Sequence, residues 1–167
     1  MRAPVFILTM NAPQGLCIAR SLGPIVSQEH AVTRCAVTNE RDLEKERTMG
    51  RKFTVPYALY RVHGYVNPLL AEQTGFTEMD LDLFKRSLDQ MFEYDRSAAR
   101  GLMKPVRCIA FRHESELGNA RADQLFARVA AELTPSDGQP PRSASDYLID
   151  VDDRNLPQGI TIENWVA

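Results

Sequence analysis

Residues 46–65 hold the side chains best suited to chemistry in this sequence, and that chemistry is contact with a phosphate-bearing strand. Cationic or potentially cationic side chains recur here beside a single acid, and they are Arg47, Arg51, Lys52, Arg61 and His63. A polarizable methionine, Met49, lies among them, and three tyrosines follow it. Cations bind phosphates, while aromatic rings and thioethers can lie against bases. The pattern predicts an RNA or single-stranded DNA partner.

Other readings of these residues stay open. The cations can form an ordinary solvated surface, since Glu40, Asp42 and Glu44 precede them. The tyrosines can be half-buried packing residues with a hydroxyl at the surface. His63 next to Arg61 suggests a nuclease, but cleavage needs a second histidine or a carboxylate cluster beside it. We therefore expect no catalytic residue, and no metal or cofactor is indicated.

Charge is distributed unevenly along the chain. The formal net charge of -2 and the pI of about 5.9 neither support nor exclude a nucleic-acid surface. Residues 96–113 contain Arg and Lys but no acid, whereas residues 146–163 are strongly acidic. Arg96 and Arg100 in the acid-free stretch are candidates for a second phosphate-binding patch.

Length and composition indicate one globular domain over residues 1–167. A hydrophobic content of 44% is enough for a single core. The three cysteines, Cys17, Cys35 and Cys108, are too far apart for a zinc knuckle or a redox pair, so we interpret them as reduced thiols. The apolar run at 4–10 is too short to cross a bilayer. We expect a cytoplasmic protein without membrane contact.

These candidate residues must be positioned by strands and helices. Strands are expected at 5–10, at 53–66 with a bulge near Gly64, and at 106–111, from their β-branched and aromatic content. A helix is expected to begin at Thr77, with Asp80 completing a capping box. Its core stripe is expected to be Leu81, Phe84, Leu88, Met91 and Phe92.

The remainder of the chain is expected to hold a second helix and a hairpin. The helix is predicted at 119–133, and strands at 147–151 and 160–165 are predicted to pair with each other. Residues 134–142 are rich in proline and are interpreted as a surface linker. The order of these elements predicts an α+β fold built on a largely antiparallel sheet.

Six segments together resemble a known family, the subtype I-C Cas-seven family, whose members are the repeated backbone subunit of the type I CRISPR complex called Cascade. They occur in order through most of the chain and are 27–34 (SQEHAVTR), 47–52 (RTMGRK), 55–64 (VPYALYRVHG), 73–76 (QTGF), 92–101 (FEYDRSAARG) and 113–120 (HESELGNA). The resemblance implies a palm similar to an RNA-recognition motif, with an inserted thumb at about 36–52.

The resemblance also implies a function: non-catalytic binding of CRISPR guide RNA in antiviral defence. The implied partners are the guide RNA, other Cascade subunits including copies of the same family and, indirectly, target DNA. The residues that we expect to contact RNA are Arg34, Arg47, Met49, Arg51, Lys52, Arg61, His63, Arg96 and Arg100.

The sequence departs from the family at its beginning. Family members start with a palm strand and a helix, whereas residues 1–5 here fall where the resemblance places an internal strand. We expect a partial palm with an unpaired sheet edge, which the apolar runs at 5–10 and 16–19 can repair. Two alternatives follow: a truncated copy that joins the complex and blocks it, as an inhibitor does, or a non-functional remnant.

Overall fold

The computed structural model describes residues 4–11, 20–33, 49–95, 101–134 and 140–166. It is a mixed α+β fold with antiparallel sheets, as the sequence predicted. The strands are β1 (Pro4–Asn11), β2 (Arg20–Ser21), β3 (Gln28–Thr33), β4 (Met49–Thr54), β5 (Leu59–Tyr65), β6 (Lys104–His113), β7 (Val129–Leu133), β8 (Tyr147–Val151) and β9 (Ile160–Asn164). The helices are α1 (Pro68–Thr74), α2 (Glu78–Tyr94) and α3 (Ala122–Phe126), and a 3-10 turn covers Ala144–Asp146.

A five-stranded sheet forms the centre of the molecule, with the strand order β2-β5-β1-β6-β9. Every neighbouring pair in it is antiparallel. Because β1 lies between β5 and β6 and opposes both, β5 and β6 run parallel to each other and are joined through α2. This is a split β-α-β unit, the building block of ferredoxin-like folds.

The strand predicted at 5–10 is confirmed, but its place in the sheet differs from the expectation. The sequence suggested that this run repairs an unpaired edge. In the structure β1 is internal and hydrogen-bonds to β5 on one side and to β6 on the other. The reason is that its apolar, β-branched composition suits a strand with partners on both sides. The edge strands are β2 and β9.

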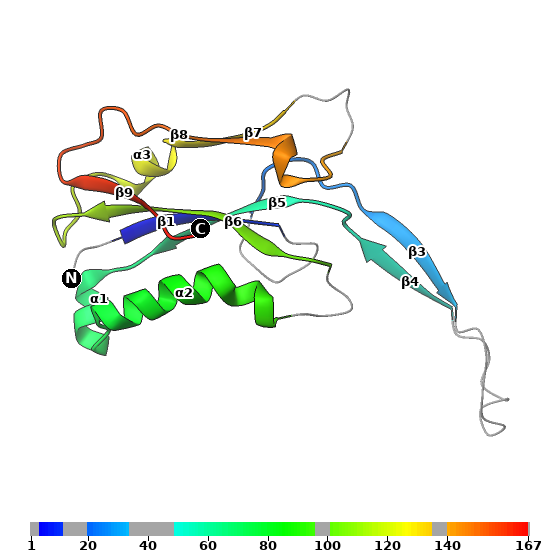
Figure 1. Cartoon of the computed structure of the whole chain (residues 1–167), viewed down its shortest axis with the longest axis horizontal. Helices are drawn as coiled ribbons and strands as arrows, with labels where there is room; N and C mark the ends of the chain where they lie inside the picture. The colour runs from blue at the N-terminus through cyan, green and yellow to red at the C-terminus, as the bar shows by residue number, and fades with distance from the viewer. Residues whose placement is uncertain (1–3, 12–19, 34–48, 96–100, 135–139, 167) are drawn as a thin grey trace, which may run out of the picture.

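Helix α2 covers one face of the sheet, together with α1 (Figure 1). The predicted cap is confirmed, because the Thr77 side chain accepts from the Asp80 amide and the Asp80 side chain accepts from the Thr77 amide. Leu81 is buried. The other four residues of the predicted stripe are partly buried and pack against Cys108 and Ala110 of β6, and they are Phe84, Leu88, Met91 and Phe92.

The opposite face of the sheet is covered by α3 and the β7–β8 hairpin (Figure 1). Ile109 and Phe111 of β6 meet Leu125, Phe126 and Val129 in this core. Of the helix predicted at 119–133, only Ala122–Phe126 is helical, and Val129–Leu133 is a strand. The alanines in that strand favour helix locally, but pairing with β8 buries Val129 and leaves the alternating positions exposed.

Three further expectations are corrected. The terminal strands do not pair with each other, because β8 pairs with β7 and β9 pairs with β6. The strand predicted over 53–66 is divided between β4 and β5, with Pro56 in the break. The register of β5 runs evenly past Gly64, and the irregularity lies instead between Thr9 and Met10, opposite β6.

The strands β3 and β4 form a separate two-stranded ribbon. Figure 1 shows it extending away from the end of the central sheet where β5 begins. Residues 28–32 and 50–53 of the ribbon are exposed, and Thr54 is half-buried. The thumb predicted at about 36–52 falls mostly on residues 34–48, which lie outside the described part of the chain.

Candidate nucleic-acid interface

The β3–β4 ribbon carries three of the predicted RNA-contacting residues, Met49, Arg51 and Lys52, and its register decides where they lie. His30 is opposite Lys52, and Ala31 is opposite Arg51. Side chains alternate between the faces of a strand, and directly opposed residues share a face. Arg51 and Lys52 are adjacent in the sequence and therefore lie on opposite faces of the ribbon.

One ribbon face carries Lys52 and His30. The His30 ring nitrogen Nε2 lies 2.9 Å from the Thr54 hydroxyl, which holds the ring along the ribbon. Within the described part of the chain, Lys52 has no acidic partner and its side chain is exposed. Val32, which is 52% exposed, shares this face. The face can offer a cation and an apolar contact to a strand of nucleic acid.

The other ribbon face carries less net positive charge than the Lys52 face, because it pairs an arginine with a glutamate. Arg51 Nη1 lies 3.2 Å from Glu29 Oε1, and both side chains are exposed. Phe53, which is 52% exposed, lies opposite Glu29 on the same face. A phosphate that approaches Arg51 must compete with the Glu29 carboxylate. Met49 opposes Thr33 through its backbone, at the end of the ribbon farthest from the sheet.

A row of arginines crosses the central sheet near the base of the ribbon. Arg20 of β2 is opposite Arg61 of β5, Arg61 is opposite Thr9 of β1, and Thr9 is opposite Arg107 of β6. Directly opposed residues share a face, so the three arginines lie on the same face of the sheet. Three strand-to-strand steps place the backbones of Arg20 and Arg107 roughly 14 Å apart. Both residues are exposed.

Arg20 and Arg107 were not predicted from the sequence as site residues. Arg107 stood in the acid-free stretch 96–113, but nothing in the sequence aligned it with Arg61 or Arg20. Arg20 and Arg61 are directly opposed, so their like charges repel each other, and an anion bound beside them relieves the repulsion. We define the arginine row as Arg20, Arg61 and Arg107.

Arg61 is held by a contact inside the protein. Its Nη2 donates to the Val129 carbonyl of β7 at 2.9 Å. Its Nε is buried and has no hydrogen-bond partner among the described residues. Burial lowers the pKa of the guanidinium, and no carboxylate of the described residues pairs with it. Arg61 therefore has a structural role between the sheet and the β7–β8 hairpin, besides its position in the row.

His63 and Tyr65 also face the covered side of the sheet. The His63 ring stacks on Phe126 of α3 with centroids 4.0 Å apart and an interplanar angle of 16°. Tyr65 meets the same ring edge-on at 5.6 Å. Burial and then the charge of Arg61 lower the pKa of His63. One face of the His63 ring is thus already occupied by Phe126.

The remaining predicted contact residues lie outside the described part of the chain, and they are Arg34, Arg47, Arg96 and Arg100. Among the residues that the structure describes, no group of three or more His, Cys, Asp or Glu side chains could hold a metal ion. In the same residues, no helix combines the length and the apolar character that crossing a membrane requires.

The chain is similar to a known protein family. The model of the family described as CRISPR-associated protein Cas7 matches residues 10–152, which is most of the 167-residue chain. The matched region includes the ribbon, the arginine row, α2 and the β7–β8 hairpin. A search of the curated proteins found no match.

Proposed function

This chain belongs to the CRISPR-associated protein Cas7 family, and on that premise we propose that it is a non-catalytic backbone subunit that binds CRISPR guide RNA. The complex is a type I-C Cascade-like surveillance complex that acts in antiviral defence. Its partners are the guide RNA, other subunits of the complex including copies of the same family and, through the guide, target DNA.

One observation carries this proposal: the cationic ribbon and the arginine row lie at the same end of the sheet. Strand β4 ends at Thr54 and β5 begins at Leu59, so the chain passes from Lys52 to Arg61 within nine residues. Arg20 stands beside Arg61 on the neighbouring strand. A strand that crosses the base of the ribbon can meet both groups of cations. Phosphate contacts of this kind supply affinity with little sequence preference.

The structure supports backbone contact more than base stacking on the sheet. RNA-recognition motifs stack bases on aromatic side chains of an open sheet face. Here the face opposite α2 is covered by α3 and the β7–β8 hairpin, and Phe126 occupies one side of the His63 ring. We propose that His63 supports the interface from within and that the guide is bound through its phosphates.

The central sheet is the proposed palm, and residues 36–52 are the proposed thumb. The split β-α-β unit made by β5, α2 and β6 around β1 supports the palm assignment. The thumb begins on the exposed ribbon, and Met49 is proposed to lie against a base there with Arg47 beside it. Arg34, Arg96 and Arg100 are proposed as further phosphate contacts, and residues 134–142 as a surface linker within one domain.

The inhibitor reading is not favoured. It depended on a palm that lacked its first strand and exposed an unpaired edge. In the structure β1 is internal, with β5 and β6 paired along it. The sheet runs continuously from β2 to β9, although β2 pairs only with Tyr60 and Arg61 of β5.

Binding of the full chain to a fluorescein-labelled generic single-stranded RNA tests the proposal. Fluorescence anisotropy would be measured over a series of KCl concentrations. Each phosphate contact contributes about −0.7 to the slope of log K against log salt for a single strand. We expect a steep slope for the wild type, reduced by roughly 0.7 in Arg20→Ala. A flat slope for the wild type contradicts phosphate binding.

Arg121→Ala is the matched control. Arg121 is also an exposed arginine, but its Nε and Nη2 are bonded to Asp123 at 3.0 and 3.1 Å. We expect this variant to bind RNA with the wild-type slope. Equal losses in Arg20→Ala and Arg121→Ala would mean that only net charge matters and that the arginine row is not a site.

A further inference from the structure

The ribbon is joined to the central sheet by two short connectors. Residues 22–27 lead from β2 into β3, and residues 55–58 lead from β4 into β5. In the described part of the chain the ribbon pairs with no other strand, so the connectors decide the angle at which it leaves the sheet. Each connector contains a proline, Pro24 or Pro56, whose fixed φ and missing amide hydrogen limit bending.

The two connectors are held together at the edge of the sheet. The Leu22 amide donates to the Leu59 carbonyl at 2.9 Å, which joins the first residue of one connector to the residue that follows the other. Ala58 and Leu59 are both buried. A change in the direction of the ribbon must therefore arise beyond this joint, in residues 23–27 and 55–57.

Tyr147, the first residue of β8, contacts both connectors beyond the joint. A Cβ at position 23 would lie only 3.3 Å from the Tyr147 hydroxyl oxygen, so this close approach requires Gly23. The Tyr147 ring also lies beside the Tyr57 ring, with centroids 6.4 Å apart and an interplanar angle of 35°. Figure 1 shows the start of β8 at the end of the sheet from which the ribbon extends. One buried side chain of the covering hairpin thus touches both segments that carry the ribbon.

The backbone around Tyr147 is fixed by hydrogen bonds. It follows a 3-10 turn that ends at Asp146, whose carboxylate accepts from the Ser143 amide at 3.0 Å. The Asp146 carbonyl accepts from the Thr134 amide at 2.7 Å. Burial raises the pKa of the Tyr147 hydroxyl, against a hydrogen bond with the Leu59 backbone that lowers it, so the hydroxyl is uncharged at neutral pH. The connectors therefore meet a neutral side chain on a fixed backbone.

We propose that Tyr147 is a positioning residue, which holds both connectors and so sets the direction of the ribbon relative to the arginine row. Its effect on RNA rests on the proposed function, because one strand can meet Lys52 and the arginine row together only if the ribbon keeps a fixed direction. A ribbon that swings offers the two groups of cations separately, and the gain from binding both at once is lost. Tyr147 is 7% exposed, so it acts through the connectors and not by contact with RNA.

Pulsed electron paramagnetic resonance of the full chain without RNA tests the positioning role. Nitroxide labels would be attached at Val32→Cys on the ribbon and at Leu83→Cys on α2, which are both exposed positions. Cys17 and Cys35 would be replaced by serine. We expect one narrow distribution of distances in this background and in Tyr147→Phe, which keeps the ring. Tyr147→Ala should broaden the distribution, and an unchanged distribution in Tyr147→Ala overturns the proposal.

Ile149→Ala is the matched control. Ile149 lies two residues farther along β8, on the same side of the strand, and packs against the core beneath α3. The substitution removes an apolar side chain from the same hairpin, and it should lower stability without broadening the distribution. Broadening of equal size in Ile149→Ala and Tyr147→Ala would assign the effect to general loosening of the hairpin, which also overturns the proposal.

A second pair of variants tests the contact itself without removing the ring. Gly23→Ala places a Cβ against the Tyr147 hydroxyl and should shift the measured distances. In the Tyr147→Phe background the hydroxyl is absent and the next ring atom, Cε1, is 3.9 Å away, so the same substitution should shift them less. Equal shifts in the two backgrounds would show that the hydroxyl does not hold this connector, and would overturn the proposal.

The RNA affinity of the unlabelled variants measures the consequence for binding. At one KCl concentration, Tyr147→Ala is expected to bind generic single-stranded RNA at least about tenfold more weakly than the wild type, and Tyr147→Phe should bind as the wild type does. Altered distances with unaltered affinity overturn the link between ribbon direction and binding. If the wild type itself binds no RNA, the proposed function fails, while the label distances still decide whether Tyr147 positions the ribbon.

Discussion

Arg61 of β5 and Val129 of β7 are joined by a hydrogen bond from the guanidinium Nη2 to the carbonyl oxygen, 2.9 Å long. The two residues lie on different layers, the central sheet and the hairpin that covers it. A residue whose type suggests phosphate binding thus also connects the layers. From the sequence, Arg61 was expected only to contact RNA, and the hydrogen bond to Val129 adds this second role.

Replacing Arg61 should therefore lower stability. We expect Arg61→Ala to reduce the free energy of unfolding by about 1 to 2 kcal/mol, because the Val129 carbonyl loses a charged donor beneath the hairpin. Urea denaturation followed by circular dichroism measures this change. Arg20→Ala is the control, since Arg20 is exposed in the same row and should change stability by less than about 0.5 kcal/mol. Equal stability of the two variants would contradict the layer-joining role.

The stack of His63 on Phe126 predicts a dependence of stability on pH. Burial and the charge of Arg61 lower the pKa of His63 below its ordinary value of 6.5, so the unfolded chain takes up the proton first as pH falls. The stabilisation is complete above 6.5 and is lost as pH falls from there toward the folded pKa. His113, whose pKa is also lowered by burial, contributes in the same direction.

Unfolding measured between pH 8 and 5 in His63→Phe tests this expectation. Phenylalanine retains a ring to stack on Phe126 but cannot take up a proton. We expect a shallower loss of stability than in the wild type, with the remainder due in part to His113. His30→Asn, which removes an exposed histidine on the ribbon, serves as the control. An unchanged pH profile in His63→Phe would show that protonation of His63 does not contribute to the loss of stability.

The two faces of the ribbon should contribute unequally to RNA binding. Lys52→Ala removes a cation without an acidic partner in the described residues, so we expect the salt slope of RNA binding to fall by roughly 0.7. Arg51→Ala removes a cation whose charge Glu29 already balances, and should have a smaller effect. Both variants leave the sheet untouched, so each is the control of the other. A larger loss in Arg51→Ala would reverse the assignment of the faces.

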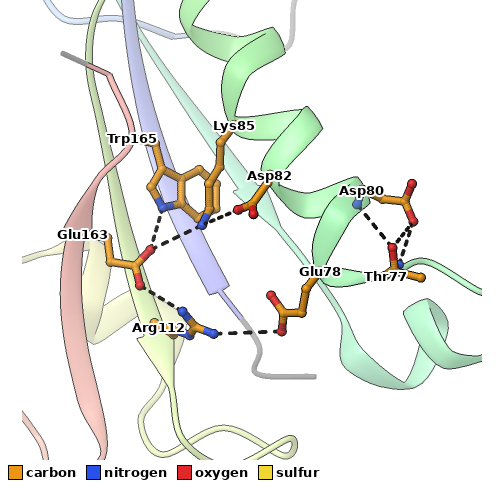
Figure 2. Close-up of polar contacts among 8 residues, drawn as sticks. All are labelled: Thr77, Glu78, Asp80, Asp82, Lys85, Arg112, Glu163 and Trp165. Carbon is orange, nitrogen blue, oxygen red and sulfur yellow. Dashed lines mark hydrogen bonds and ion pairs between the residues drawn. The ribbon is translucent and has the colours of Figure 1, made fainter.

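The polar cluster between β9 and α2 predicts sensitivity to acid. Glu163 accepts hydrogen bonds from Trp165 Nε1 at 2.9 Å and from Arg112 Nη1 at 3.2 Å. Figure 2 shows Lys85 beside the same carboxylate. Burial raises the pKa of Glu163, but the hydrogen bonds from Trp165 and Arg112 and the charge of Lys85 outweigh it, so its pKa lies below 4.5. The stabilisation is present above pH 4.5 and is lost as pH falls through the folded pKa.

We expect Glu163→Gln to lower the free energy of unfolding by about 1 kcal/mol at neutral pH. The variant should also lose less stability than the wild type between pH 4.5 and 3. Urea denaturation at both ends of that range measures the difference. Asp82→Asn, which removes only an exposed partner of Lys85, should retain the wild-type acid profile. Parallel acid profiles for Glu163→Gln and the wild type would assign the acid response to other carboxylates.

The sequence predicted correctly those features that depend only on contacts between residues close together in the chain. The cap at Thr77, the apolar stripe from Leu81 to Phe92 and the strand at 5–10 each follow from side chains within a few residues of one another. The cationic composition of residues 47–52 also follows from sequence alone, and the matched family agrees with the resemblance that those residues carried.

Pairing between distant segments decided what local preference could not. Residues 129–133 have helix-compatible composition, yet hydrogen bonding to β8 and burial of Val129 make them a strand. The predicted pairing of β8 with β9 was also wrong. β8 pairs with β7 in the covering hairpin, whereas β9 pairs with β6 in the central sheet.

The arrangement of the candidate site likewise came from tertiary structure. Arg20, Arg61 and Arg107 share a row only because the registers of β2, β5, β1 and β6 align them. Arg51 and Lys52 lie on opposite faces of the ribbon, because side chains alternate along β4 in the observed pairing with β3. The sequence determined which charges this protein carries, and non-local hydrogen bonding and burial decided which of them stand together.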